Sequence, residues 1–121
     1  MRRYLIGLLA MLAGPALALD VVATSTSMGA LVRAVAPEAD LTVLSGPEQD
    51  LHMLQAKPSM IRALRSADLL VAVGAELEAG WLPAASTSAA NPEILPGREG
   101  YFEAAAQVPL LDTGGTADRA R

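Results

Sequence analysis

The run from Asp68 to Gly74 constrains the fold of this chain more than any other segment. Five consecutive apolar residues, from Leu69 to Val73, lie between an acidic residue and a glycine. Successive side chains of a β-strand point to opposite faces of the sheet, so a strand of this composition is apolar on both faces. Strands buried on both faces belong to parallel sheets that helices cover. The run therefore predicts a buried parallel strand in an α/β fold.

Alternating strand and helix patterns precede this run. Residues 20–24 and 41–44 are short apolar segments rich in β-branched residues, which are typical of strands. Between them, residues 28–35 place apolar side chains at helical spacing behind a Ser-Thr-Ser N-cap region, and Pro37 ends the helix. A second helix opens at Pro58. This βαβαβ order predicts a parallel sheet with helices on both faces.

The last third of the chain carries weaker patterns. Residues 77–85 favour a helix, and residues 86–100, rich in Pro, Gly, Ser and Asn, favour a surface loop. Residues 108–111 are predicted to form a last short strand, where Pro109 indicates a sheet edge. The sequence thus predicts one α/β unit with a parallel sheet of about four strands flanked by helices.

A secretory leader precedes these elements. Arg2 and Arg3 form a basic head, residues 4–13 are almost wholly apolar, and a Gly-Pro break leads to the small residues of a cleavage site. A membrane anchor needs about 20 apolar residues, and this run is shorter. We therefore predict that residues 1–18 are a signal peptide cleaved near Ala18, and that residues 19–121 are periplasmic or secreted.

Charge and cysteine content narrow the partners of the exported part. The chain has nine Lys and Arg residues, two of them in the leader, against 13 Asp and Glu residues. This balance argues against nucleic acid as a partner, because phosphate binding needs clustered basic side chains. No cysteine is present, so stability outside the cytoplasm relies on the aliphatic core rather than on disulfides.

His52, the single histidine, lies in a polar loop after the second predicted strand. Ligands of parallel α/β sheets sit outside the carboxyl ends of the strands. The same rim should hold Asp50 from that loop, and Glu76 and Glu78 from the loop after residues 68–74. Imidazole and carboxylate groups together suit zinc or manganese. Taken alone, however, a single histidine is more often a surface residue without a function.

Other chemistries lack their residue patterns. The Gly-Ala-Glu segment at residues 74–76 has neither the glycine spacing nor the lysine of a phosphate-binding loop. The serines of the predicted loops have no recognisable pairing with His52, so a serine hydrolase is not indicated. Neither a phosphate-binding loop nor a serine hydrolase is therefore predicted.

The same segments resemble the substrate-binding proteins of zinc and manganese ABC importers, a periplasmic metal-binding family. Residues 21–36 resemble the family's first strand and helix, and residues 52–59, from His52 to the Pro-Ser pair, resemble its first metal-ligand loop. Residues 67–82 continue the match. Three shorter pieces resemble a long connecting segment of the zinc-type branch, namely residues 91–97, 100–101 and 118–120.

The resemblance implies a two-lobed binding protein of which residues 19–121 are the first, metal-binding lobe. It also implies that the protein captures a ligand and is not an enzyme. It implies that His52 ligates a divalent metal ion, zinc more readily than manganese, for delivery to an ABC permease in the inner membrane. We expect Glu78 to be a second metal-site residue, which orients His52 or adds negative charge beside the ion. Asp50 and Glu76 rank below it. The family's second-ligand motif would begin near the end of this chain, so we expect a truncated form without the second lobe.

A different class of function stays open at the level of sequence. The chain also fits a stand-alone exported interaction module, or a metallochaperone-like module, without an importer. If the chain is instead a first lobe without its partner, apolar side chains that the second lobe would cover should be bare. We expect exposure of Trp81, Leu82 and residues 108–111, with self-association through that face.

Overall fold

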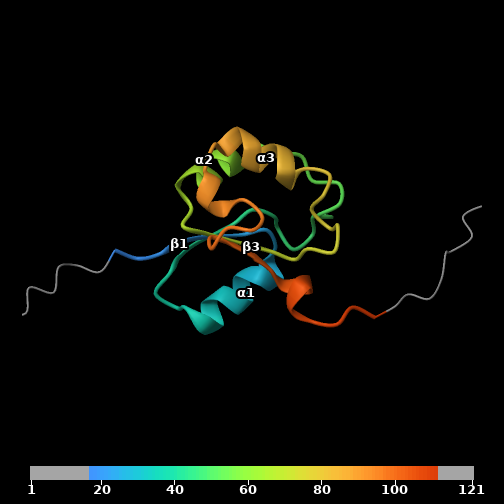
Figure 1. Ribbon diagram of the computed structural model, residues 1–121, viewed down its shortest axis with the longest axis horizontal. Coiled ribbons are helices and arrows are strands. Elements are labelled where there is room, and N and C mark those ends of the chain that lie inside the picture. The colour runs from blue at the N-terminus through green and yellow to red at the C-terminus, as the bar shows by residue number, and fades with distance from the viewer. Residues whose placement is uncertain (1–16, 112–121) are drawn as a thin grey trace, which may run out of the picture.

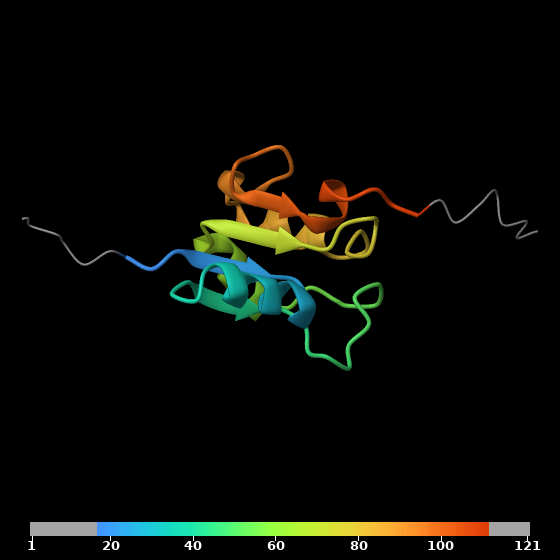
Figure 2. The same ribbon diagram turned by 90° about the horizontal axis from the view of Figure 1, so that it is seen from below.

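A computed structural model describes residues 17–111, so the predicted leader lies almost wholly outside the described residues, as do residues 118–120. The described residues contain one parallel sheet with the strand order β2-β1-β3-β4 (Figure 2). The predicted α/β architecture with a four-stranded parallel sheet is confirmed. The strands are β1 (Asp20–Ala23), β2 (Asp40–Val43), β3 (Leu69–Ala72) and β4 (Tyr101–Glu103).

Helices cover both faces of this sheet, as the sequence predicted. Helix α1 (Thr26–Val35) lies on one face, and α2 (Pro58–Ser66) and α3 (Leu82–Ala89) pack side by side on the other (Figure 1). Two short 3-10 turns, η1 (Pro92–Ile94) and η2 (Ala104–Gln107), flank β4. Within residues 17–111, no helix is long and apolar enough to cross a membrane.

Two apolar clusters, one on each face of the sheet, form the core. The larger cluster lies between the sheet and the α2–α3 layer, where Leu64, Leu70 and Ile94 are fully buried. Neighbouring residues of β3 divide between the clusters, as its two-faced apolar run predicts. The smaller cluster lies beneath α1 and comprises Val21, Ala23, Met28, Val32 and Val71.

Local sequence signals explain where the first two helices begin. The Ser25 hydroxyl accepts a hydrogen bond from the Met28 backbone N–H at 3.2 Å, which caps the free end of α1. Helix α2 begins at Pro58, whose fixed φ and missing N–H are tolerated in a first turn. Both starts agree with the sequence predictions.

The predicted helix over residues 77–85 is wrong in its position. Gly74, Ala75 and Glu76 have φ values of +85°, +52° and +67°, which no right-handed helix contains. The chain passes through this left-handed segment and a series of turns before α3 begins at Leu82, with Pro83 in its first turn. The helix therefore runs into the segment that the sequence assigned to a loop.

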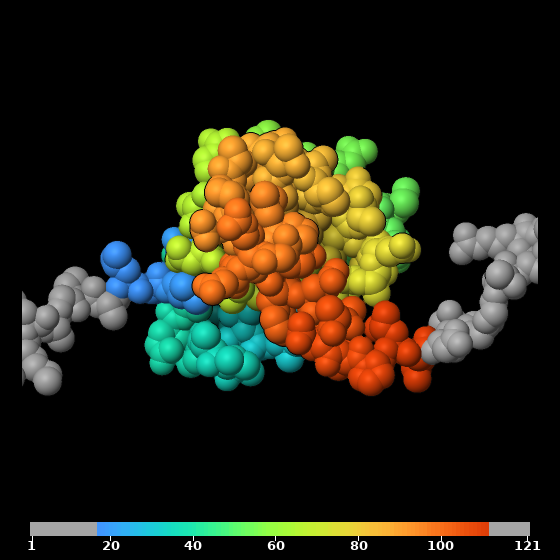
Figure 3. Space-filling model, in the orientation of Figure 1, coloured from blue at the N-terminus to red at the C-terminus, as the bar shows by residue number. Residues whose placement is uncertain are grey.

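The predicted loop over residues 86–100 is wrong at its start, which lies in α3, and the predicted strand over residues 108–111 is wrong. Ser86 lies in α3, and Ile94 is fully buried in η1. The fourth strand is β4, where Gly100 fits a narrow space because a Cβ there would collide with the carbonyl oxygens of Glu93 and Asp68. Residues 104–111, drawn in orange-red in Figure 3, lie at the surface beside the layer of α1.

The expected exposure of apolar residues is confirmed only for the end of the described chain. Val108, Leu110 and Leu111 are 58%, 62% and 91% exposed. Trp81 and Leu82 are buried, so the prediction that they are bare is wrong. They belong to the larger apolar cluster, because the turns before α3 fold back onto the core.

Candidate metal centre

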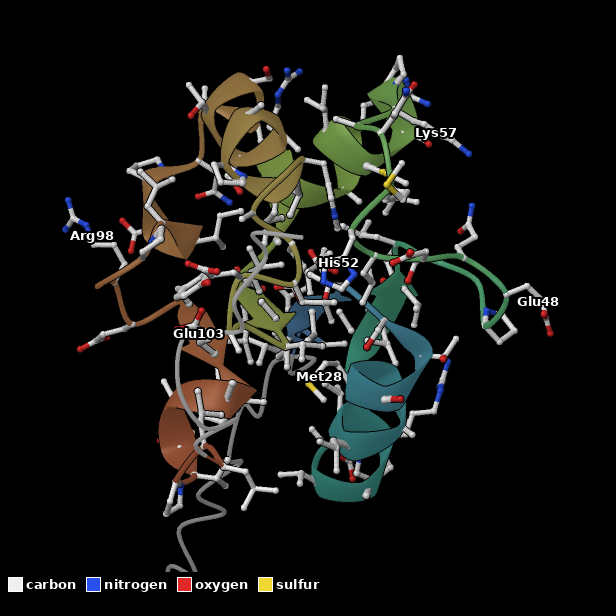
Figure 4. All side chains as sticks on the ribbon, turned by 90° about the vertical axis from the view of Figure 1, so that its right-hand side faces the viewer. Met28, Glu48, His52, Lys57, Arg98 and Glu103 are labelled. Atoms are coloured by element: carbon white, nitrogen blue, oxygen red, sulfur yellow. The ribbon has the colours of Figure 1, made fainter. Side chains whose placement is uncertain are left out.

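The loops that follow β1, β2 and β3 meet at the carboxyl ends of the strands, the edge at which α/β folds of this type hold ligands. Figure 4 looks onto this edge. His52 lies near the middle of the view, whereas Glu48 lies at the outer tip of the same loop and Glu103 lies on the side of β4. The rim therefore collects an imidazole and several carboxylates.

The imidazole of His52 is exposed and held by one carboxylate. Its Nδ1 lies 3.0 Å from Oδ1 of Asp50, and the two side chains are 65% and 61% exposed. The backbone N–H of His52 donates to the same oxygen at 2.9 Å. These two hydrogen bonds from His52 lower the pKa of Asp50 below its ordinary value. The prediction that His52 lies in an exposed loop is confirmed.

The loop that carries His52 is anchored to the core on both sides of the histidine. Leu51 and Leu54 are buried in the larger apolar cluster. The indole Nε1–H of Trp81 donates a 2.8 Å hydrogen bond to the backbone carbonyl of Leu51. A Cβ at Gly80 would lie 3.3 Å from the carbonyl oxygen of His52, so the turns before α3 pass close beside this loop.

Glu78 lies on those turns, and its carboxylate faces the backbone that leaves β3. It is only 4% exposed and accepts hydrogen bonds from the N–H groups of Val73 and Gly74 at 3.0 and 3.3 Å. Burial raises the pKa of Glu78 above its ordinary value, and the charge of Glu103 raises it further, against the effect of the two backbone hydrogen bonds. Glu78 thus holds the left-handed turn against the end of the strand.

A hollow of about 400 Å³ opens between these turns, α3 and β4. Glu76, Glu78 and Glu103 line it together with Tyr101 and apolar side chains, whereas His52 is not among its lining residues. The Tyr101 hydroxyl donates a long 3.5 Å hydrogen bond to Oε1 of Glu103. Burial, and then the charges of Glu103 and Glu78, raise the pKa of Tyr101. The hollow is an acidic neighbour of the histidine loop.

The structure brings His52 together with Asp50. No hydrogen bond joins Glu78 to His52 within residues 17–111, and the role of Glu78 at a metal stays a prediction. The sequence analysis did not predict this contact, although the spacing of two residues within one loop was a signal that could have found it. Sequence reasoning missed Tyr101 and Glu103 because it placed the last strand elsewhere.

An imidazole nitrogen with nearby carboxylates can donate electron pairs to zinc or manganese. Among the described residues, no group of three or more His, Cys, Asp and Glu side chains gathers closely enough to hold a metal ion. What this part of the chain supplies is one ready nitrogen ligand within an acidic rim.

Comparison with known proteins places these features in a wider group. The family described as the periplasmic component A of the zinc-uptake complex matches residues 21–119. No curated protein matches the chain in sequence. Several solved structures, however, are similar to this chain in fold.

The crystal structure of ZnuA superposes with a TM-score of 0.55 at 24% identity, covering 61% of this chain and 29% of that one. The periplasmic zinc-binding protein TroA from Treponema pallidum superposes with a TM-score of 0.51 at 22% identity. That match covers 73% of this chain and 29% of TroA. Zn(II)-bound AdcA from Streptococcus pneumoniae superposes with a TM-score of 0.51 at 19% identity. That match covers 60% of this chain and 16% of AdcA. These likenesses show a shared fold, and the chain spans less than a third of the length of each structure.

Proposed function

The chain belongs to the family of periplasmic zinc-uptake complex components, and from this premise we propose that residues 19–121 form the metal-capturing lobe of a solute-binding protein. The lobe captures a divalent metal ion, zinc in preference to manganese, and passes it to an ABC permease in the inner membrane. Residues 1–18 direct the chain to the periplasm as a cleaved signal peptide. The protein binds and releases its cargo without chemical change.

The exposed imidazole of His52 is the observation that carries this proposal. Asp50 engages its Nδ1 at 3.0 Å, and the side chain stands 65% exposed on the rim where ligands of this fold bind. A neutral imidazole is a frequent ligand of zinc. His52 therefore serves as the first ligand of the captured ion.

Glu78 contributes to the same centre in this proposal, through its charge. Its turn passes beside the histidine loop, as the short approach of Gly80 to the His52 carbonyl indicates. A carboxylate at this depth, together with Glu103 in the adjoining hollow, lowers the electrostatic potential of the rim and attracts cations. Glu78 also keeps the turn in place, so it supports the centre even where it does not touch the ion.

Binding by residues 19–121 alone is expected to be weak. Zinc in proteins takes three or four ligands, and one imidazole with scattered carboxylates does not fill that coordination sphere. A titration of zinc against a competing chelator measures the affinity of residues 19–121 directly. Tight one-to-one binding would contradict this expectation.

Substitution of the histidine tests the proposal itself. We expect His52→Ala to remove the specific zinc binding that the titration detects and to leave the unfolding temperature nearly unchanged, because the side chain is exposed. Gln55→Ala, an exposed substitution in the same loop, is the matched control and should keep the affinity. An equal affinity in His52→Ala and the parent chain would refute a ligand role for His52.

The apolar end of the described chain favours a second candidate, a stand-alone exported interaction module. Val108, Leu110 and Leu111 follow β4 in the chain, and all three are exposed. Clusters of exposed apolar side chains are common on protein-binding surfaces. Capture by detergent-solubilised ABC permease separates the two candidates. Zinc-dependent capture supports the importer component, and self-association without permease binding supports the interaction module.

A further inference from the structure

The loop between β2 and α2 leaves His52 little backbone freedom. Leu51 is 8% exposed and Leu54 is 9% exposed, so the loop is pinned on either side of the histidine. The Trp81 indole, itself 2% exposed, adds a 2.8 Å hydrogen bond to the carbonyl of Leu51, the residue before the histidine. The freedom that remains at this position is the rotation of the imidazole ring and the choice of which nitrogen carries the proton.

Asp50 acts on that remaining freedom. Its Oδ1 accepts the backbone N–H of His52 at 2.9 Å, which positions the carboxylate before the ring engages it. The Met53 N–H donates to the Asp50 carbonyl at 3.1 Å and closes the turn between them. The ring nitrogen Nδ1 then meets the same Oδ1 at 3.0 Å. The carboxylate is oriented by the backbone, so the ring contact costs little additional ordering.

An ionised carboxylate has no proton to donate, so Nδ1 of a neutral His52 must be the donor. The proton then resides on Nδ1, and Nε2 carries the free electron pair. The ring hydrogen bonds within residues 17–111 involve Nδ1 alone, and the side chain is 65% exposed. We propose that Asp50 is a positioning residue that fixes the Nδ1–H tautomer and the orientation of His52, so that Nε2 is presented to the captured metal ion.

The link to metal capture rests on the proposed function, whereas the tautomer does not. Carboxylates that accept the second ring N–H of a metal-binding histidine set its tautomer and raise its basicity, and their loss lowers metal affinity about 10–100-fold. Asp50→Ala should therefore weaken zinc binding within that range. Asp50→Asn keeps an oxygen at Oδ1 that can accept both bonds, so it should retain the tautomer and recover part of the affinity.

Nuclear magnetic resonance reads the tautomer without any metal. Because His52 is the single histidine, a two-bond ¹H–¹⁵N spectrum of labelled residues 19–121 contains one pair of ring nitrogens. At about pH 8, where an ordinary imidazole is neutral, we expect a protonated Nδ1 and an unprotonated Nε2. Asp50→Ala should move the proton to Nε2, and Asp50→Asn should resemble the parent chain.

The outcomes of these experiments separate the positioning role of Asp50 from its link to metal capture. A parent spectrum with the proton on Nε2, or an Asp50→Ala spectrum identical to the parent, overturns the positioning role. An Asp50→Ala chain with the altered tautomer but undiminished zinc affinity overturns the link to metal presentation. A parent chain with the expected tautomer that binds no zinc leaves the tautomer assignment standing and refutes the proposed function.

Discussion

At the scale of single residues, Glu78 has a structural task that is separate from any metal. Its two carboxylate oxygens accept the N–H groups of Val73 and Gly74, at the point where the chain leaves β3 and enters a left-handed turn. Those N–H groups would otherwise be left without partners, since the chain has departed from the sheet. A carboxylate therefore replaces the partner that a longer neighbouring strand would have supplied.

Glu78→Gln should lower the free energy of unfolding at neutral pH by about 1–3 kcal/mol, because the amide offers one acceptor oxygen for two N–H groups, one buried and one partly buried. Urea unfolding followed by circular dichroism measures this loss. Glu76→Gln removes the same charge from an exposed neighbour on the turn and is the control, with little expected change. Equal stability of both variants would contradict the bracing role of Glu78.

The same residue predicts a pH dependence. The pKa of Glu78 is raised in the folded state above its ordinary value of 4.5, so the folded protein binds the proton more tightly than the unfolded chain. Stability from this group therefore increases as the pH falls through the raised value and levels off below the ordinary value. The difference in unfolding free energy between the parent chain and Glu78→Gln should grow from neutral pH to about pH 5. A difference that shrinks over this range would contradict the sign of the shift.

At the scale of elements, Gly29 sets how closely α1 approaches the sheet. A Cβ on this residue would lie 2.7 Å from Cγ2 of Val43 in β2. The valine is β-branched and has little rotamer freedom with which to move aside. The glycine thus allows a helix–sheet contact that any larger residue would push apart.

Gly29→Ala tests this close approach, because two effects of opposite sign compete. Alanine favours the helix by about 1 kcal/mol over glycine, and overpacking costs about 1–3 kcal/mol. We expect a net loss of about 1 kcal/mol in thermal unfolding. Ala30→Gly, at the exposed neighbouring position, measures the effect of helix preference on stability without the overpacking. A more stable Gly29→Ala chain would show that the space between α1 and β2 accommodates a methyl group.

Comparison of the elements shows what the sequence could predict. Strands β1 and β3 are dominated by consecutive apolar residues that lie buried, which leaves little alternative for them. Strand β2 is a partly exposed edge strand, and its short β-branched segment was the signal for it. Strand β4 has three residues, and its place depends on Gly100 fitting between two distant carbonyls, which no local pattern reveals. The start of α3 was misplaced for a similar reason, since Ala75 and Glu76 adopt left-handed backbone that their residue types do not favour.

The candidate site divides in the same way. His52 is visible in the sequence because it is the single histidine and follows a predicted strand. The contact between Asp50 and the ring is local, two residues apart, and was within reach of sequence reasoning. The hydrogen bond from Trp81 to Leu51 joins residues 30 positions apart, so it required the fold. Tyr101 and Glu103 reach the rim only through β4.

At the scale of the whole molecule, helices cover the two faces of the sheet to different extents. Two helices cover one face, and a single helix, α1, covers the other. Phe102 of β4 is 42% exposed, and Val108, Leu110 and Leu111 add further exposed apolar surface after η2. Edge strand β4 has a neighbour on one side only within the described residues. Together these features form an open apolar margin along β4.

This margin predicts self-association of residues 19–121 when they are made alone. Sedimentation velocity over a concentration series should show species larger than a monomer, because exposed apolar surface and a free strand edge favour association. The double substitution Leu110→Ser and Leu111→Ser should reduce it. Val35→Ser, an exposed apolar position on α1, is the control and should leave it unchanged. A monomer at every concentration would contradict the prediction.

Trp81 gives the molecule an internal optical reporter. It is the single tryptophan of the chain, it is buried, and its indole is bonded to the residue before His52. Indole emission responds to the polarity around the ring and to the hydrogen bond at Nε1. A movement of the histidine loop away from the core would therefore stretch this bond and change the fluorescence, so the anchoring of the loop can be followed in real time without an added label.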